Sequence, residues 1–389
     1  MANQLDMCMV NESLFTRRYI AVRKALFLVC GLSLAGCACD CRYVEPPIPS
    51  GGAPLSRPIT TESSSGGQPL RDVVYYGAYF SNNTIAIAGG ALQEQTPVGL
   101  LSQSDGSADI WSKIVFPSFI QLSAVHRRSD ATYLIAGRIG DPIASQSPQG
   151  QWSLDESRSH VSAQIRRFVT GQAGPVGIGF APFNSSVSPR TLALVERSRG
   201  VWESKQAGEG TWSSGPLCAA ATDSGQIFFV SEERRPLAPE QTLHLYSSND
   251  GRVWTSRVEY HWPSNAPVPK PSDCVALMPL QIAMAVEVQG EAQIWQTDGT
   301  APWTVIGQAG YGVGLRIALT AGGRGVLIGQ SGFARWTTDG GRTWQAGVGL
   351  DPVESFMQVG SVGGDRYFAL GRSSGFLTSD GGRTWMRRL

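Results

Sequence analysis

The sequence has no marked excess of charge and few residues that commonly bind metals. Its 32 Lys and Arg residues balance 31 Asp and Glu residues, which gives a formal net charge of +1. A nucleic-acid-binding protein would show a basic excess gathered into a patch, so we expect no nucleic-acid partner. The histidines show no ligand spacing with cysteines or with one another, so we expect no metal and no cofactor: His126, His160, His244 and His261.

Helical periodicity and an apolar segment long enough to cross a membrane are also missing. The apolar run at 25–34 is too short for a transmembrane helix. The other apolar runs lack the helical period of 3.6 residues, which predicts an all-β chain. The 46 glycines fit a chain with frequent tight turns.

A repeated eight-residue motif stands out near the C-terminus. Residues 378–385 (TSDGGRTW) repeat residues 337–344 (TTDGGRTW) almost letter for letter. The Asp carboxylate can fold back onto its own backbone N–H groups, Gly supplies a positive φ, and Trp begins the next strand with its indole under the turn. Each copy therefore predicts a hairpin tip, built on Asp339, Gly341 and Trp344 in one case and on Asp380, Gly382 and Trp385 in the other.

Weaker copies of the motif extend toward the N-terminus. Residues 247–254 keep the spacing, with Asn249 in place of Asp followed by Gly251 and Trp254. Residues 296–303 keep the Asp and the Trp, and three further segments keep only small polar residues before a Trp. The intervals between these tryptophans are 41, 60, 42, 49, 41 and 41 residues, close to the period of a four-stranded propeller blade: Trp111, Trp152, Trp212, Trp254, Trp303, Trp344 and Trp385.

Each of these units also carries an apolar run upstream of its tryptophan, as a blade strand buried on both faces requires. The runs are 85–88, 133–136, 192–195, 227–230, 282–286, 326–328 and 367–370. We therefore predict an all-β fold, a seven-bladed β-propeller of four-stranded antiparallel blades with Asp-box turns, over residues 71–389. The alternative is a β-sandwich or several small β modules, which would not generate a repeat near 41 residues.

The motif Ser/Thr-x-Asp-x-Gly-x-Thr-Trp resembles the Asp-box, or BNR, repeat of sialidase-type β-propellers. The stretch 329–333 leading to Thr337 is also similar to seven-bladed BNR proteins of the photosystem II assembly-factor type, which are lipid-anchored or lumenal. The resemblance implies that the Asp-box residues are structural and not catalytic. It also implies a non-enzymatic propeller that binds a protein partner.

The same resemblance places the Asp-box at the turn between the third and fourth strands of a blade. The two long tryptophan intervals would then lengthen connections on the opposite face of the propeller. One includes Arg166, Arg167 and Phe183, and the other includes Tyr260 and Trp262. Aromatic and arginine side chains in Pro-stiffened loops suit a protein-binding surface, so we predict the binding face there. The alternative is that these aromatics only cover strand ends.

A sialidase-like exo-glycosidase is the alternative function, with a glycan as ligand. Such an enzyme would grip a substrate carboxylate with three arginines and would pair a Tyr nucleophile with a Glu. Its early Arg-Ile-Pro segment corresponds here to Arg138-Ile139-Gly140, which lacks the proline, and the repeat count is seven, not six. The candidate residues are Arg138, Arg197, Arg316 and Tyr311. We expect no catalytic residue among the Asp-boxes.

Residues 1–36 have the layout of a signal peptide, with basic residues before the apolar run. The segment 34–37 resembles the bacterial lipobox, which implies cleavage before Cys37 and diacylation of its thiol; the alternative is an ordinary signal peptide with a chance Cys. Ala38 favours the outer membrane by the sorting habit of such lipoproteins. We expect a monomer in the cell envelope, facing the periplasm or the cell surface, that contacts the membrane only through its N-terminal lipid.

Residues 37–70 are rich in Pro, Gly and Ser and cannot bury a core, so we interpret them as a flexible tether. Only 386–389 follow the last Trp, and we expect chain around 69–76 to complete the outer strand of the seventh blade and close the ring.

Two cysteines occupy the same place in consecutive units. Cys218 and Cys274 each precede an apolar run by eight or nine residues, early in the innermost strand, where neighbouring blades crowd around the axis. In an oxidising compartment we expect a disulfide between them, the alternative being two buried free thiols. Cys39 and Cys41 lie in the tether, where they either pair with another chain or stay reduced.

Overall fold

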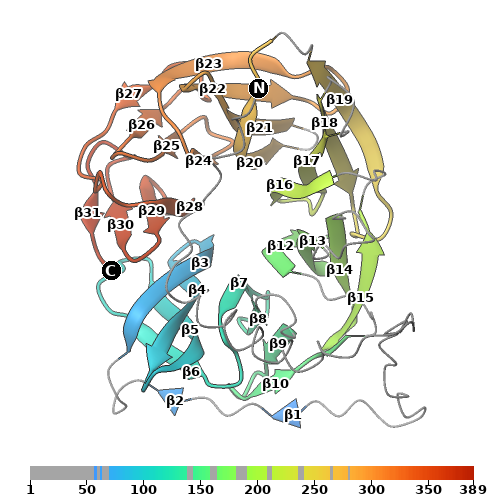
Figure 1. Ribbon diagram of the computed structural model, residues 1–389, viewed down its shortest axis with the longest axis vertical. Helices are drawn as coiled ribbons and strands as arrows, with labels where there is room; N and C mark the ends of the chain where they lie inside the picture. The colour runs from blue at the N-terminus through green and yellow to red at the C-terminus, as the bar shows by residue number, and fades with distance from the viewer. Residues whose placement is uncertain are drawn as a thin grey trace, which may run out of the picture. The chain divides into compact units, whose positions relative to one another are not determined.

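The described residues form seven β-sheets arranged as blades around a central axis, with no helix among them (Figure 1). The chain is therefore an all-β, seven-bladed β-propeller, as the repeat predicted. The computed structural model describes residues 57–58, 62–63, 70–137, 143–157, 164–180, 191–207, 213–234, 241–262, 266–278 and 281–389. The predicted signal peptide, the lipidation site Cys37 and most of the predicted tether lie outside these ranges.

Each blade is an antiparallel sheet whose four strands follow one another in chain order from the axis outward. Blades 1 to 3 consist of β3 (Arg71–Ser81), β4 (Thr84–Gln93), β5 (Thr96–Asp105) and β6 (Ser112–Phe116); β7 (Leu122–Arg127), β8 (Tyr133–Gly137), β9 (Ile143–Gln146) and β10 (Trp152–Leu154); and β12 (Gln164–Gly171), β13 (Gly174–Phe180), β14 (Thr191–Ser198) and β15 (Val201–Gln206).

The other blades have the same order. Blades 4 to 7 consist of β16 (Ser213–Ala221), β17 (Ile227–Arg234), β18 (Gln241–Ser248) and β19 (Thr255–Trp262); β20 (Lys270–Met278), β21 (Gln281–Val288), β22 (Glu291–Thr297) and β23 (Thr304–Tyr311); β24 (Arg316–Leu319), β25 (Gly325–Ile328), β26 (Ala334–Thr337) and β27 (Gln345–Ala346); and β28 (Phe356–Gly363), β29 (Arg366–Gly371), β30 (Gly375–Thr378) and β31 (Met386–Arg387).

Six of the seven apolar runs are second strands, buried on both faces by the neighbouring blades; in β25 every residue is buried. The third blade differs from the prediction. Its run at 192–195 belongs to the third strand, β14, because β13 supplies the second. The buried indole that begins the fourth strand is Trp202 and not Trp212, which lies outside the described residues. The turn before Trp202 carries no Asp-box sequence, so the motif could not reveal it.

The turns at the two C-terminal motifs have the predicted geometry. Asp339 Oδ1 accepts hydrogen bonds from the backbone N–H groups of Arg342 (3.1 Å) and Thr343 (2.9 Å), and Gly341 has a φ of 89°. The indole N–H of Trp344 donates to the Gly341 carbonyl at 2.8 Å. Burial alone would raise the pKa of Asp339, but its hydrogen bonds, led by those from Thr343, lower that pKa to about 2.

The turn at 247–254 corrects the predicted role of Asn249. Its carboxylate comes from the next residue, Asp250, whose Oδ1 accepts from the backbone N–H of Arg252 at 2.8 Å. Gly251 has a φ of 75°, and its carbonyl accepts from the indole of Trp254 at 2.9 Å. This turn has one residue fewer between its Asp and its Gly than the turns at Asp339 and Asp380. Aligning the repeated motifs therefore matched Asn249, and not Asp250, to the Asp position.

The ring does not close in the predicted way. The fourth strand of blade 7 is its own β31, and the segment around 71–76 belongs to β3, the inner strand of blade 1. Gln358 of β28 joins the two blades, since its side-chain amide accepts from Ala78 N–H (2.8 Å) and donates to Ala78 O (3.0 Å).

Chain from the predicted tether range instead extends the outer edges of blades 1 and 2, where β2 (Glu62–Ser63) pairs with β6 and β1 (Arg57–Pro58) pairs with β10. On blade 3, the short strand β11 (Glu156–Ser157) pairs with β15.

Candidate binding site at the axial channel

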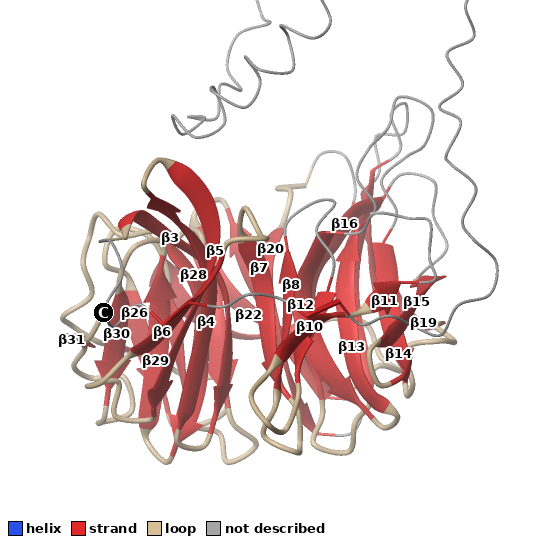
Figure 2. Ribbon diagram, turned by 90° about the horizontal axis from the view of Figure 1, so that it is seen from below, coloured by secondary structure: helices blue, strands red, loops and turns tan. Residues whose placement is uncertain are grey.

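The propeller has two unlike faces. The lower face carries the turns between first and second strands and between third and fourth strands, which lie at the bottom of Figure 2. The upper face carries the connections between second and third strands and between successive blades. All seven inner strands run from the upper face to the lower face, so residues early in each inner strand surround the upper end of the axis.

A cavity of about 360 Å³ lies at this upper end. Every blade contributes to its wall through the early part of its inner strand. One lining residue from each blade, in order, is Tyr76, Ser123, Arg166, Cys218, Asp273, Arg316 and Gln358.

The wall of the cavity contains a ring of β-bulges. In six of the seven inner strands the register with the second strand shifts by one residue at the level of the cavity, and each unpaired residue lines it. These residues are Tyr76, Ser123, Arg166, Leu217, Ser272 and Met357. A bulge interrupts the alternation of side chains along a strand, so consecutive residues can face the same space. The bulge in β12 accordingly places both Arg166 and Arg167 in the wall.

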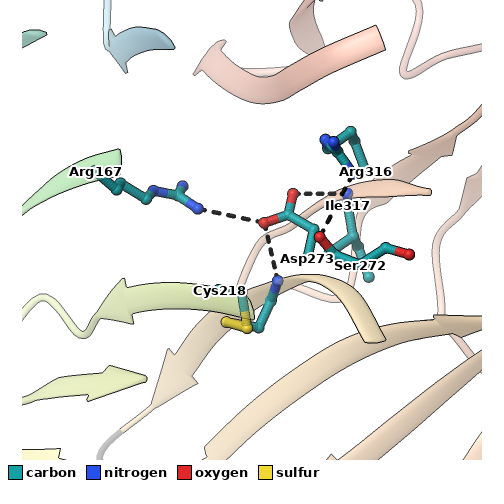
Figure 3. Close-up of a disulfide and its surroundings, with 7 residues drawn as sticks. Arg167, Cys218, Ser272, Asp273, Arg316 and Ile317 are labelled. Carbon is teal, nitrogen blue, oxygen red and sulfur yellow. Dashed lines mark hydrogen bonds and ion pairs between the residues drawn. A yellow bond between two sulfur atoms is a disulfide. The ribbon is translucent and has the colours of Figure 1, made fainter. Parts of the chain in front are cut away.

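Asp273 connects three blades at the wall of this cavity (Figure 3). Its Oδ1 accepts a hydrogen bond from the backbone N–H of Cys274 at 2.9 Å and pairs with Arg167 Nη1 of blade 3 at 3.3 Å. Its Oδ2 accepts from the backbone N–H of Ile317 of blade 6 at 3.2 Å. Both oxygens of the carboxylate are therefore occupied, and its charge is balanced by Arg167.

A disulfide joins Cys218 of blade 4 to Cys274 of blade 5, next to Asp273 (Figure 3). The two Cα atoms are 5.7 Å apart, and both cysteines are buried. Both cysteines lie on inner strands, β16 and β20, as the sequence predicted. The disulfide and Asp273 together hold blades 3 to 6 to one another at the wall of the cavity.

Arg316 enters the cavity from blade 6 without a carboxylate partner among the described residues. Its guanidinium is held by backbone carbonyls, since Nε donates to Met357 O at 2.7 Å and Nη1 donates to Leu315 O at 2.7 Å. Nη1 also lies 3.4 Å from Ser272 O. Carbonyl groups fix the position of a guanidinium but leave its net charge in place.

Arg166 reaches the same cavity from blade 3. Its guanidinium carbon lies 4.9 Å from the ring centre of Phe180, and within the described ranges it has no hydrogen bond and no ion pair. Arg166 keeps an exposed surface, but partial burial of its charged group lowers its pKa, and the positive charge of Arg316 lowers it further. Two arginines without an anionic partner among the described residues therefore face one cavity.

The remaining predicted binding residues do not form an exposed loop. Trp262 is the last residue of the outer strand β19 and only 3% exposed, because alternate side chains of β19 pack into the core between blades 4 and 5. Tyr260 is half-buried, with its ring centre 5.1 Å from that of Trp295. The prediction that Trp262 displays a binding surface was therefore wrong, and for Tyr260 it stays a prediction. Phe183 lies outside the described residues.

The glycosidase candidates are not brought together either. Arg316 lies at the upper end of the axis, whereas Arg197 lies near the lower end of β14 and Tyr311 ends the outer strand β23 with its side chain 84% exposed. Arg138 lies outside the described residues. Asp273 is the one carboxylate among the described residues that line the upper cavity.

Exposed apolar side chains also occur on the upper face, and sequence patterning did not single them out as a surface. Tyr311 and Val313 lie where blade 5 leads into blade 6, and Val353 lies in the connection from blade 6 to blade 7. Val353 is 87% exposed. Each of these connections leads directly into an inner strand and hence to the rim of the cavity.

The lower end of the axis has a larger and more polar opening of about 780 Å³. Its wall includes His126, Thr170, Asp223 and Ser361. Burial, and secondarily the charge of Arg128, lowers the pKa of His126 to about 4, so this imidazole is neutral at physiological pH. In the part of the chain that the structure describes, no three His, Cys, Asp or Glu residues gather as a metal site, and no helix could span a membrane.

The sequence matches no protein-family model and no curated protein. Solved structures with a similar fold include hydrazine synthase from Kuenenia stuttgartiensis, at 11% identity and a TM-score of 0.56, with 81% of this chain and 98% of that chain covered. YCF48 bound to D1 peptide is 14% identical, with a TM-score of 0.52 and coverage of 82% and 95%. Virginiamycin B lyase from Staphylococcus aureus is 9% identical, with a TM-score of 0.54 and coverage of 81% and 96%. At these identities the likeness concerns the fold alone.

Proposed function

We propose that this chain is a non-enzymatic, lipid-anchored β-propeller of the bacterial cell envelope that binds a protein partner through its upper face. The observation that carries the proposal is the cavity at the upper end of the axis, which Arg166 enters from a β-bulge and Arg316 from the regularly paired strand β24, neither with a carboxylate partner among the described residues. Bulges of this kind are common beside functional sites, where they redirect side chains. The lipid anchor and the envelope location rest on the sequence around Cys37.

The surroundings of the cavity suit a protein partner. Tyr311, Val313 and Val353 expose apolar surface on connections that lead to the cavity rim. Aromatic and arginine side chains are enriched among the residues that dominate protein interfaces. Seven inner strands fix the base of the site, so the partner would meet a largely preformed surface.

The lower face offers less for recognition. The carboxylates of its turns, such as Asp339 and Asp298, accept hydrogen bonds from their own backbone and are not available to a partner. Its two most exposed apolar residues, Ile110 and Val253, stand singly at the tips of separate turns, and Met278 and Val305, each about half exposed, lie at the lower ends of β20 and β23. YCF48 bound to D1 peptide, a structure with the same fold, supports the idea that a propeller of this kind can hold a peptide.

Matched surface variants test this proposal. The full-length lipidated chain would be purified from envelope extract as wild type, as an upper-face variant (Tyr311→Asp with Val353→Asp) and as a lower-face variant (Ile110→Asp with Val253→Asp). All four side chains are strongly exposed, so both variants should melt at the wild-type temperature. We expect one co-purifying protein to be lost from the upper-face variant only. Equal loss from both variants, or retention by the upper-face variant, would contradict the proposal.

The exo-glycosidase alternative retains one supporting observation, since Arg166 and Arg316 could grip the carboxylate of an acidic sugar. Among the described residues that line the upper cavity it lacks the Glu that such an enzyme pairs with a Tyr nucleophile, since the one lining carboxylate is Asp273. Turnover of a fluorogenic sialoside by the wild type, abolished by Arg316→Ala, would favour the enzyme over the binding protein.

A further inference from the structure

We propose that Arg166 and Arg316 form a carboxylate-binding site in the upper cavity of the axial channel. The two residues lie on blades 3 and 6, which are as far apart as two blades can be in a ring of seven. A carboxylate between them would be held from both sides of the axis. This inference deepens the proposed function and rests on it only where the carboxylate belongs to the protein partner.

The described carboxylates around the cavity are too few to pair with all of its arginines. Among the described residues that line the cavity are three arginines and one carboxylate, that of Asp273, which pairs with Arg167. Within the described residues Arg166 and Arg316 have no anionic partner. Two positive charges that face one cavity repel each other, and a bound anion would relieve that repulsion.

The donors point to a carboxylate and not merely to any anion. A guanidinium offers parallel N–H groups whose spacing matches the two oxygens of a carboxylate. Arg316 uses Nε and Nη1 on backbone carbonyls, which keeps its plane fixed, while Nη2 makes no hydrogen bond within the described residues. Arg166 makes no hydrogen bond within the described residues and rests against the Phe180 ring. One rigid and one adaptable arginine together suit capture of a small planar anion.

The walls of the cavity indicate what carries the carboxylate. Leu122, Ile165, Ile178 and Leu217 line it beside the arginines. An apolar wall favours an acid attached to an organic group over a fully hydrated inorganic anion such as phosphate. The volume of about 360 Å³ is near the lower end of ligand pockets, at about 300 Å³. The ligand is therefore a single small acidic group, either a free organic acid or the C-terminal residue of a peptide.

Isothermal titration of the full-length protein with two acids and their neutral counterparts tests this site and separates the two sources. N-acetyl-leucine imitates a peptide C-terminus, and N-acetyl-leucinamide is its neutral control. Glucuronate represents a free sugar acid, and glucose is its neutral control. We expect at least one acid to bind ten times more tightly than its control. The acid that binds identifies the source, and equal binding of each acid and its control would overturn the proposal.

Variants tie the binding to the two arginines. Arg166→Gln with Arg316→Gln should weaken acid binding at least tenfold, whereas Arg252→Gln with Arg342→Gln removes the same charge from exposed turns of the lower face and should change it less than twofold. Because Arg316 bonds to backbone carbonyls, its loss could disturb the fold. Arg166→Gln alone breaks no hydrogen bond among the described residues, so it should lose acid affinity at an unchanged melting temperature. Equal weakening by the lower-face pair, or full affinity in Arg166→Gln, would contradict the site.

The outcome is distinguishable from that of the partner experiment. If the acids bind but the upper-face variant Tyr311→Asp with Val353→Asp still retains its partner, the carboxylate site stands and the proposed function fails. If that variant loses the partner while neither acid binds, the proposed function stands and the carboxylate site fails.

Discussion

Replacing Asp273 by Asn should destabilise the propeller while strengthening acid binding at the axis. The carboxylate accepts from Cys274 N–H and pairs with Arg167 through one oxygen, and it accepts from Ile317 N–H through the other. An Asn side chain has one oxygen, so in either orientation its amide N–H₂ faces a buried donor. An unsatisfied buried donor costs about 1–3 kcal/mol. The lost pairing with Arg167, whose side chain is 35% exposed, adds less than about 1 kcal/mol.

Urea unfolding followed by tryptophan fluorescence measures this effect. The matched control is Asp223→Asn, an exposed residue at the lower opening that makes no hydrogen bond within the described residues and should shift stability by less than about 0.5 kcal/mol. The second readout is titration with N-acetyl-leucine. Arg167 is not neutralised in Asp273→Asn, so the affinity should rise at least about twofold. Unchanged stability, or weaker acid binding by a folded Asp273→Asn, would refute the reasoning.

Three further predictions follow from the blade contacts. Cys218→Ala with Cys274→Ala should lower the free energy of unfolding by about 2–4 kcal/mol because it removes the disulfide. The melting temperature should fall, and reductant should not lower it further. A wild-type melting temperature in this variant would contradict the role of the disulfide. Asp339 has a folded-state pKa of about 2 against an ordinary 3.8, so it should contribute stability above about pH 4 that disappears as the pH falls through 2. In a plot of stability against pH, Asp339→Ala should therefore lose less stability than the wild type as the pH falls. An equal loss in the two proteins would count against this role of Asp339. Trp262→Ala should lower the free energy of unfolding, measured in urea, by about 3–5 kcal/mol because the indole is buried between blades. Wild-type stability together with weaker partner binding would instead support the predicted role of Trp262 in a binding surface.

Local sequence was enough to predict the blades and most of the turns. Residues 337–344 encode their own hairpin, since the carboxylate, the glycine and the indole that shape the turn lie within eight positions. The same locality explains the failures. The turn before Trp202 is too short for the motif, and Asp250 does the work assigned to Asn249.

The candidate site could be predicted only in part. The sequence placed Arg166 and Arg167 in a connection of the upper face, whereas both lie in the inner strand β12, and the bulge that turns both toward the axis depends on pairing with β13. Trp262 was misjudged because the alternation within β19 decides which aromatic is buried. Arg166 and Arg316 line the same cavity only because the blades close into a ring, and no local sequence pattern encodes that closure.

Local sequence patterns also failed to predict how the ring of blades closes. The short C-terminal segment suggested an incomplete seventh blade, yet β31 completes that sheet. The chain before blade 1 instead pairs with the edges of blades 1 and 2, through β2 and β1. Which exposed edge a short segment joins depends on where the chain passes in space.

The central claim is that recognition takes place on the upper face beside the axis. Site-specific photo-cross-linking in intact cells tests it most directly, with a benzophenone amino acid at Val353 on the upper face or at Val253 on the lower face, both strongly exposed. We expect one discrete cross-linked partner from Val353, none from Val253, and a weaker product when Arg166→Gln is combined with the Val353 probe. The same product from Val253, or none from Val353, would contradict it.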